Sequence, residues 1–179
     1  IRVESIEAHE IQPRYNKWIH HELQHFYGPS KRYVYEVKTN TGLVGLGESG
    51  SPESEAVRKG YIGTNPFDHV GDMTLLGLGT AMYDLMGQAA GVPVHRLIGQ
   101  RQRRWVKVGS WTVSADPSHM AEAVKQYSRR GYTWLKYHLS PFENVFDQLE
   151  AMQKVAPPGF KVQFDVTMGG TDDHTPDLL

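Results

Sequence analysis

The sequence contains no cysteine, which excludes disulfide bonds, thiolate metal ligands and cysteine nucleophiles. No run of apolar residues approaches the roughly 20 that a membrane-spanning helix needs. Nineteen basic residues against 20 acidic ones leave a net charge of -1, so no global field of one sign would attract nucleic acid or anionic lipid. We therefore expect a cytoplasmic globular protein with no nucleic-acid or membrane partner.

The stretch HELQH, residues 21–25, places two histidines four residues apart with a glutamate after the first, as in a zinc-peptidase helix. His21 and His25 would bind the metal, and Glu22 would activate a water molecule. The longer metzincin pattern requires a third histidine where this chain has Lys31, and a protonated lysine has no lone pair to offer zinc. A zinc peptidase is therefore kept only as an alternative.

Alternating polar and apolar residues predict an antiparallel sheet in the N-terminal part of the chain. Residues 32–49 alternate on both sides of turn residues 40–42, which predicts a hairpin, and residues 1–12 alternate as a third strand. Residues 13–31 are then a connecting loop with room for one short helix. From residue 74, leucine and methionine recur at helical spacing, and we interpret Asp84 within this helix as a structural hydrogen-bonding group.

After a basic run, Arg101–Arg104, which we interpret as a solvated linker, strands alternate with helices. This order is typical of βαβ units and a parallel sheet. A complete (β/α)8 barrel needs eight strands, so we expect the chain to be the front part of a longer protein. The predicted strands cover residues 106–113, 132–138 and 160–166, and the predicted helices cover residues 116–131 and 146–156, with a further helix opening in 174–179.

Four motifs, in this order, resemble the mandelate racemase/muconate lactonizing enzyme family of the enolase superfamily. They are GLVGLGES after the hairpin turn, AMYDLMGQAAGVPVHRLIGQ at residues 81–100, KYH at 136–138 and FDV at 164–166. The resemblance extends over essentially the whole chain. It implies an α/β fold in which residues 1–104 form an α+β capping domain, a three-stranded antiparallel sheet plus helices. Residues 105–179 would form the first β/α units of a TIM-type (β/α)7β barrel, incomplete in this chain.

The same resemblance implies Mg²⁺-dependent abstraction of the proton α to the carboxylate of a small-molecule substrate. An acid-sugar (aldonate or aldarate) dehydratase or a racemase fits best. Lys136 matches the first lysine of the family's Lys-x-Lys motif and would neutralise the substrate carboxylate. His138 stands where the family has its second lysine, and a neutral imidazole can serve as the base. Asp165 matches the family's first metal ligand.

In this family, the loop after the first capping strand helps to select the substrate. The resemblance therefore implies that Trp18, His20, His21 and His25 bind substrate, and Thr167, which replaces a commonly found asparagine, joins them. We also expect a homo-oligomer. A different class of function stays open: the chain could be a non-catalytic binding or assembly module.

Overall fold

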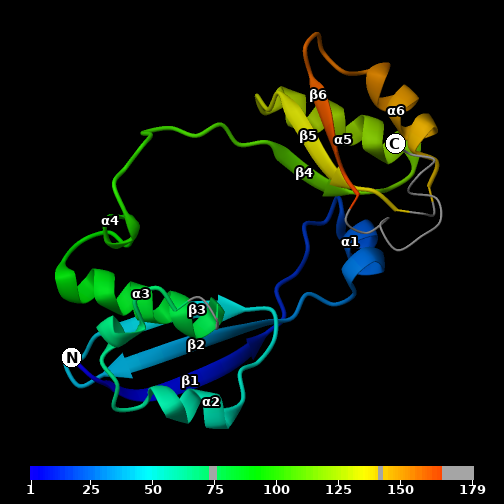
Figure 1. Cartoon of the computed structure of the whole chain (residues 1–179). Helices are drawn as coiled ribbons and strands as arrows, with labels where there is room; N and C mark the ends of the chain where they lie inside the picture. The colour runs from blue at the N-terminus through cyan, green and yellow to red at the C-terminus, as the bar shows by residue number, and fades with distance from the viewer. Residues whose placement is uncertain (73–75, 141–142, 167–179) are drawn as a thin grey trace. The chain divides into compact units, whose positions relative to one another are not determined.

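The computed structural model describes residues 1–72, 76–140 and 143–166. Contacts divide it into two compact units (Figure 1). Unit 1 comprises Ile1–Arg14 and Pro29–Arg104, and unit 2 comprises Tyr15–Gly28 and Trp105–Leu179. The domain division at residues 104 and 105 stays a prediction, but residues 15–28, which we expected in the capping domain, cluster with the second unit. The helix opening expected in 174–179 lies outside the described residues.

Unit 1 is built on an antiparallel sheet of three strands in the order β1-β2-β3. The predicted hairpin is confirmed, and Gly42 adopts a φ of 79° in its turn, a conformation that suits glycine. One helix in particular, α3, packs against the sheet (Figure 1). The elements are β1 Val3–Ile11, β2 Arg32–Thr39, β3 Val44–Ser49, α2 Glu55–Tyr61, the 3-10 helix η1 Pro66–His69, α3 Leu76–Ala90 and α4 His95–Ile98.

Glycines let α3 approach β3 at backbone distance. A Cβ atom on Gly47 would collide with the carbonyl oxygen of Gly77, and one on Gly45 would lie 2.5 Å from that of Ala81. The GLVGLGES motif is therefore explained by helix–strand packing. The core of unit 1 gathers at this contact, with fully buried Tyr35, Val37, Leu78, Ala81, Met82 and Leu85.

Unit 2 contains a parallel sheet of three strands in the order β4-β5-β6. The predicted helix after β4 begins at Pro117, the side chain of Asp116 caps it, and Gly131 follows it with a φ of 88°. The elements are α1 His20–Tyr27, β4 Ser110–Val113, α5 Pro117–Arg129, β5 Trp134–His138, α6 Val145–Gln153 and β6 Lys161–Asp165.

One prediction about unit 2 needs correction, and another is confirmed. The strand predicted at residues 106–113 is shorter, because only Ser110–Val113 pairs with β5, and Val106 and Val108 are 71% and 70% exposed. Residues 13–31, predicted as a loop with room for one short helix, do form such a helix, α1.

The core of unit 2 lies on one face of β5. Leu135 and Tyr137 are fully buried among Met120, Val124 and Met152 of the flanking helices. The opposite face carries Lys136 and His138, as the alternation of the strand predicts. Within the described residues, none of the helices is both long enough and apolar enough to cross a bilayer.

Candidate functional site

Three side chains from two neighbouring strands meet at the carboxyl ends of β5 and β6. Lys136 Nζ lies 2.6 Å from Asp165 Oδ2, and His138 Nε2 lies 3.2 Å from the same oxygen. The cause is register: His138 pairs with Asp165 in the parallel ladder, and Lys136 lies two residues earlier on the same face. The structure thus brings together the two predicted catalytic residues and the predicted metal ligand, although their roles stay predictions.

The cluster is sheltered to different degrees. The side chains of Asp165 and His138 are 15% and 18% exposed, whereas that of Lys136 is 36% exposed. Hydrogen bonds to a carboxylate are strengthened when the donor is also charged. The shared oxygen of Asp165 therefore lies within reach of both side chains, and the more open ammonium group of Lys136 also reaches solvent.

Aromatic rings from α1 and β4 surround His138. The hydroxyl of Tyr27 lies 3.3 Å from His138 Nδ1. Phe26, Tyr27 and Trp111 present their rings to the imidazole at interplanar angles of 82°, 74° and 85°, with centroids 6.3, 6.3 and 5.7 Å away. These edge contacts are favourable aromatic geometry. The imidazole of His138 therefore lies among aromatic rings from two elements, α1 and β4.

Sequence reasoning missed these three aromatic residues. Trp111 had a usable signal, because it pairs with Lys136 and so shares its face of the sheet. Phe26 and Tyr27 had none, because nothing in the spacing of residues links α1 to β5. Partial burial raises the pKa of Tyr27, and the carboxylate of Asp165 adds to the shift, so the hydroxyl keeps its proton at neutral pH.

The predicted substrate-binding residues lie in and beside α1, in different surroundings. His21 and His25 line a cavity of about 270 Å³ together with Ser114 and Ser140, which follow β4 and β5. His20 is exposed, 6.2 Å from the ring of Tyr15. Their role in binding stays a prediction, and Thr167 lies outside the described residues.

Trp18 occupies a different place. Its ring stacks on His119 of α5 at 5.0 Å and 8°, and it meets Tyr127 edge-on. The indole also packs against the core of unit 2. These contacts show that Trp18 attaches the segment before α1 to α5, so its contribution to substrate binding remains an untested prediction.

In the described part of the chain, no group of three or more His, Cys, Asp or Glu side chains is arranged to hold a metal ion. The zinc-peptidase alternative therefore gains no third ligand, and the side chain of His21 is 91% exposed. Asp165 offers one hard oxygen ligand of the kind that Mg²⁺ prefers.

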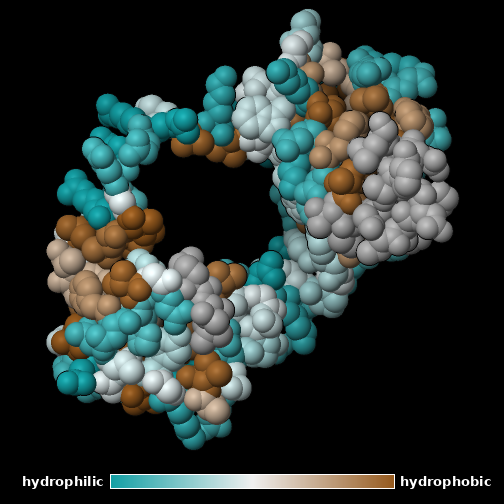
Figure 2. All heavy atoms as spheres, viewed as in Figure 1, coloured by the Kyte–Doolittle hydropathy of each residue, from teal (hydrophilic) through white to brown (hydrophobic). Residues whose placement is uncertain are grey.

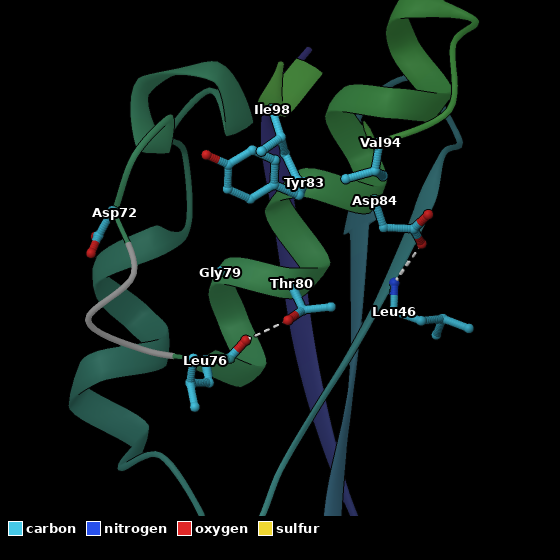
Figure 3. Close-up of a pocket in the computed structure, with 9 residues that line it drawn as sticks. All are labelled: Leu46, Asp72, Leu76, Gly79, Thr80, Tyr83, Asp84, Val94 and Ile98. Atoms are coloured by element: carbon cyan, nitrogen blue, oxygen red, sulfur yellow. Dashed lines mark hydrogen bonds between the residues drawn. The ribbon is translucent and has the colours of Figure 1, made fainter. Parts of the chain in front are cut away.

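A second cavity, of about 590 Å³, lies in unit 1 (Figure 3). Leu76, Tyr83 and Ile98 give it an apolar lining, and Figure 2 shows apolar surface around α3 and α4. Asp84 lies at its edge and turns toward β3, where Oδ2 accepts the backbone N–H of Leu46 at 2.9 Å. This contact supports the interpretation of Asp84 as a structural hydrogen-bonding group.

No protein-family model matches the chain. A curated relative, a "D-galactonate dehydratase family member" from Streptomyces sp. (strain SPB074), is 25% identical over 134 residues. The match covers 60% of this chain but 30% of that relative.

Solved structures share the fold over nearly all of the chain. A dipeptide epimerase from Enterococcus faecalis V583, complexed with Mg and the dipeptide L-Leu-L-Tyr, has a TM-score of 0.76 at 20% identity, covering 93% of this chain and 54% of that one. A member of the enolase superfamily from Roseovarius nubinhibens ISM, complexed with magnesium, has a TM-score of 0.65 at 19% identity, covering 92% and 52%. The chain therefore has the fold of an enolase-superfamily cap with part of a barrel, and the resemblance to that superfamily that its motifs indicate is confirmed.

Proposed function

We propose that the protein catalyses Mg²⁺-dependent abstraction of the proton α to a carboxylate, as an acid-sugar dehydratase or a racemase. The cluster of Lys136, His138 and Asp165 carries this proposal, because it gathers a cation, a base and a carboxylate at the ends of adjacent parallel strands. The similarity to a D-galactonate dehydratase family member supports an acid sugar as the substrate.

Each residue of the cluster has a role that its chemistry allows. The ammonium group of Lys136, 36% exposed, would pair with the substrate carboxylate and bring the α-carbon toward the imidazole. His138 would take the α-proton as general base. Asp165 holds both donors at one oxygen, so it would set the distance between the carboxylate-binding and the proton-accepting group.

Asp165 would also hold the magnesium ion, and it is the only ligand proposed among the described residues. When bound, the ion would supply Lewis-acid stabilisation of the negative charge that proton removal creates. Proteins from this fold have been solved with magnesium, which supports the choice of ion. His21, His25 and Thr167 would then meet the hydroxyl groups of the sugar chain, because imidazole and hydroxyl groups can both donate and accept hydrogen bonds.

Exchange of the α-proton tests the proposal directly. The full-length gene product that contains this chain is incubated in deuterated water with a panel of aldonates and aldarates, and loss of the α-proton signal is followed by NMR. We expect exchange with at least one acid in the presence of Mg²⁺ and its loss on chelation. His138→Gln should slow exchange by about 100-fold or more, whereas His95→Gln, at an exposed position of α4, should leave the rate unchanged.

A silent result favours the alternative. If a folded protein exchanges no α-proton across the panel and binds no Mg²⁺ in calorimetry, the enzyme proposal is wrong and a non-catalytic binding or assembly module is the better reading. If the His95→Gln variant loses as much activity as the His138→Gln variant, the cluster does not carry the reaction.

A further inference from the structure

The cavity of about 270 Å³ in unit 2 lies next to His138. Ser114, which lines the cavity, donates its backbone N–H to the His138 carbonyl oxygen at 3.0 Å. Ser140, another lining residue, follows His138 by two positions. Phe26 also lines the cavity, and its ring meets the imidazole of His138 edge-on at 82°. A substrate whose α-carbon is held at His138 would therefore extend the rest of its chain into this cavity.

Carboxylates make up most of the charged lining of the cavity. Glu22, Asp116 and Glu143 line it, and its described lining contains no lysine and no arginine. The hydrogen bond from the Ser118 hydroxyl is the largest of the interactions that hold the pKa of Asp116 below its usual value, so this group is an anion at neutral pH. The two histidines of the lining carry charge only when they are protonated. An anionic group that entered the cavity would therefore meet like charge.

Glu22 and Glu143 offer hydrogen-bond acceptors to a ligand. The side chain of Glu22 is 18% exposed, and its Oε1 lies 3.9 Å from His21 Nδ1 and 3.7 Å from His119 Nδ1, beyond hydrogen-bond distance. Oε2 of Glu143 is buried, and no described residue donates a hydrogen bond to it. Buried acceptors in folded proteins are nearly always paired. A hydroxyl group of a ligand in the cavity would supply the missing donor.

The two kinds of acid sugar differ in how they suit this lining. The cavity lies just below the range of about 300–1,000 Å³ that is typical of drug-sized ligands, so it suits a short polar chain. Ionised carboxylates only accept hydrogen bonds, and bonds that they accept from hydroxyl groups are stronger than those between neutral groups. An aldonate ends in a hydroxymethyl group, which can donate. An aldarate ends in a second carboxylate, which cannot donate and is repelled.

We propose that Glu22 and Glu143 are specificity-determining residues that accept hydrogen bonds from the hydroxyl groups of an aldonate and exclude an aldarate. The inference rests on the proposed function, in which Lys136 pairs with the carboxylate beside the α-carbon and the rest of the substrate lies in the cavity. It narrows the substrate from acid sugars in general to acid sugars with a single carboxylate.

Binding of matched acids tests the proposal without turnover. The full-length protein is used in a His138→Gln background, so that bound acid is not consumed, and affinities are measured by calorimetry in the presence of Mg²⁺. D-galactonate is compared with galactarate and D-gluconate with D-glucarate, because each pair differs only at the carbon farthest from the reacting carboxylate. We expect at least one aldonate to bind about tenfold or more tightly than its aldarate.

Charge-removing variants assign the discrimination to residues. Glu143→Gln and Glu22→Gln keep the size of the side chain, and each should tighten aldarate binding by about threefold or more while changing aldonate binding less. Glu150→Gln is the matched control, because its carboxylate on α6 is 67% exposed and pairs with Lys154 at the surface. This control should leave the ratio of the two affinities unchanged.

The outcomes separate this inference from the proposed function. Equal affinity for both acids of a pair, binding of neither acid, or a ratio that neither Glu143→Gln nor Glu22→Gln changes overturns the inference. A protein that exchanges the α-proton of an aldarate as fast as that of its aldonate keeps the proposed function and overturns the inference. A protein that binds the aldonate selectively through these residues but exchanges no α-proton overturns the proposed function and supports the selectivity of the cavity.

Discussion

A single carboxylate fixes where α5 begins. Asp116 Oδ1 accepts the backbone N–H groups of Ser118 at 2.9 Å and His119 at 3.1 Å, and the Ser118 hydroxyl donates to the same oxygen. The side-chain hydrogen bond from Ser118 contributes most to holding the pKa of Asp116 below its usual value, and the backbone N–H groups add to it. All these donors favour the ionised form.

We predict that Asp116→Ala lowers the free energy of unfolding by about 1 kcal/mol at neutral pH, as lost helix caps do. Because the folded state depresses the pKa, the contribution of the carboxylate is present above its unfolded pKa of about 3.9 and is lost as pH falls through the folded value. Urea melts of the wild type and of the Asp116→Ala variant should therefore differ at neutral pH and lie closer together near pH 3. Asp116→Asn keeps an acceptor and should cost a few tenths of a kcal/mol at either pH. A cost for the Ala variant that is equal at both pH values contradicts this account.

Some residues of the site could be predicted and others could not. Lys136, His138 and Asp165 follow from the two-residue period of a strand together with the matched ends of parallel neighbours. Tyr27 lies 111 residues from its partner His138, and no periodicity carries information across that separation. The same holds for the stacking of Trp18 on His119.

At the scale of elements, a buried hydrogen-bond network ties α6 to β5 and to the turn after β4. The Tyr137 hydroxyl donates to Gln148 Oε1 at 3.1 Å, and Gln148 Nε2 donates to Ser114 Oγ at 2.8 Å and to the Ala115 carbonyl at 2.6 Å. Gln148 is 1% exposed, so each of these groups would be without water if its partner were removed. Burial also raises the pKa of Tyr137, which keeps its hydroxyl a donor.

We predict that Gln148→Ala lowers the free energy of unfolding by about 2–3 kcal/mol, because it leaves buried donors and acceptors unsatisfied and opens a cavity. Gln153→Ala, at an exposed position of the same helix, should change it by less than about 0.5 kcal/mol. Chemical denaturation followed by tryptophan fluorescence measures both. Equal costs in the two variants would show that the network contributes nothing specific.

Long elements were predicted and short ones were missed. The period of α3 and the capped boundaries of α5 are visible in the sequence, because each spans several turns. The four-residue η1 and α4 are too short to show any period. The predicted strand at 106–113 ran too far upstream because Val106 and Val108 alternate like strand residues while remaining exposed.

At the scale of the whole molecule, each unit has a core of its own. Tyr35, Leu78 and Leu85 belong to the core of unit 1, and Met120 and Tyr137 belong to that of unit 2. The order of antiparallel strands followed by alternating strands and helices predicted both sheets. The assignment of residues 15–28 to unit 2 was not predictable, because it depends on tertiary contacts such as that of Ile19 and Leu23 with Val113.

We predict that Gly47→Ala destabilises unit 1 selectively. The added methyl group would meet the Gly77 carbonyl oxygen, and relieving that overlap should cost about 1–3 kcal/mol. Native-state hydrogen exchange should show faster exchange for amides of β1–β3 and α3, with those of β4–β6 unchanged.

Gly60→Ala supplies the control for that experiment. Gly60 lies within α2, and a Cβ atom there would meet nothing within 4 Å. Alanine should therefore stabilise the helix by about 0.5–1 kcal/mol. The packing explanation is wrong if Gly47→Ala and Gly60→Ala both speed, or both slow, the exchange of amide hydrogens in unit 1.

The Asp165 oxygen that Lys136 and His138 share also favours one register of β6 along β5. If β6 slipped by one residue along β5, the carboxylate of Asp165 would turn to the opposite face, where Leu135 and Tyr137 are fully buried. A bare anion would then enter apolar packing, while the ammonium and imidazole groups lost their common acceptor. A shifted register therefore costs free energy in two ways. The same three charged or polar side chains that we assign to chemistry thus also favour the native alignment of β5 and β6.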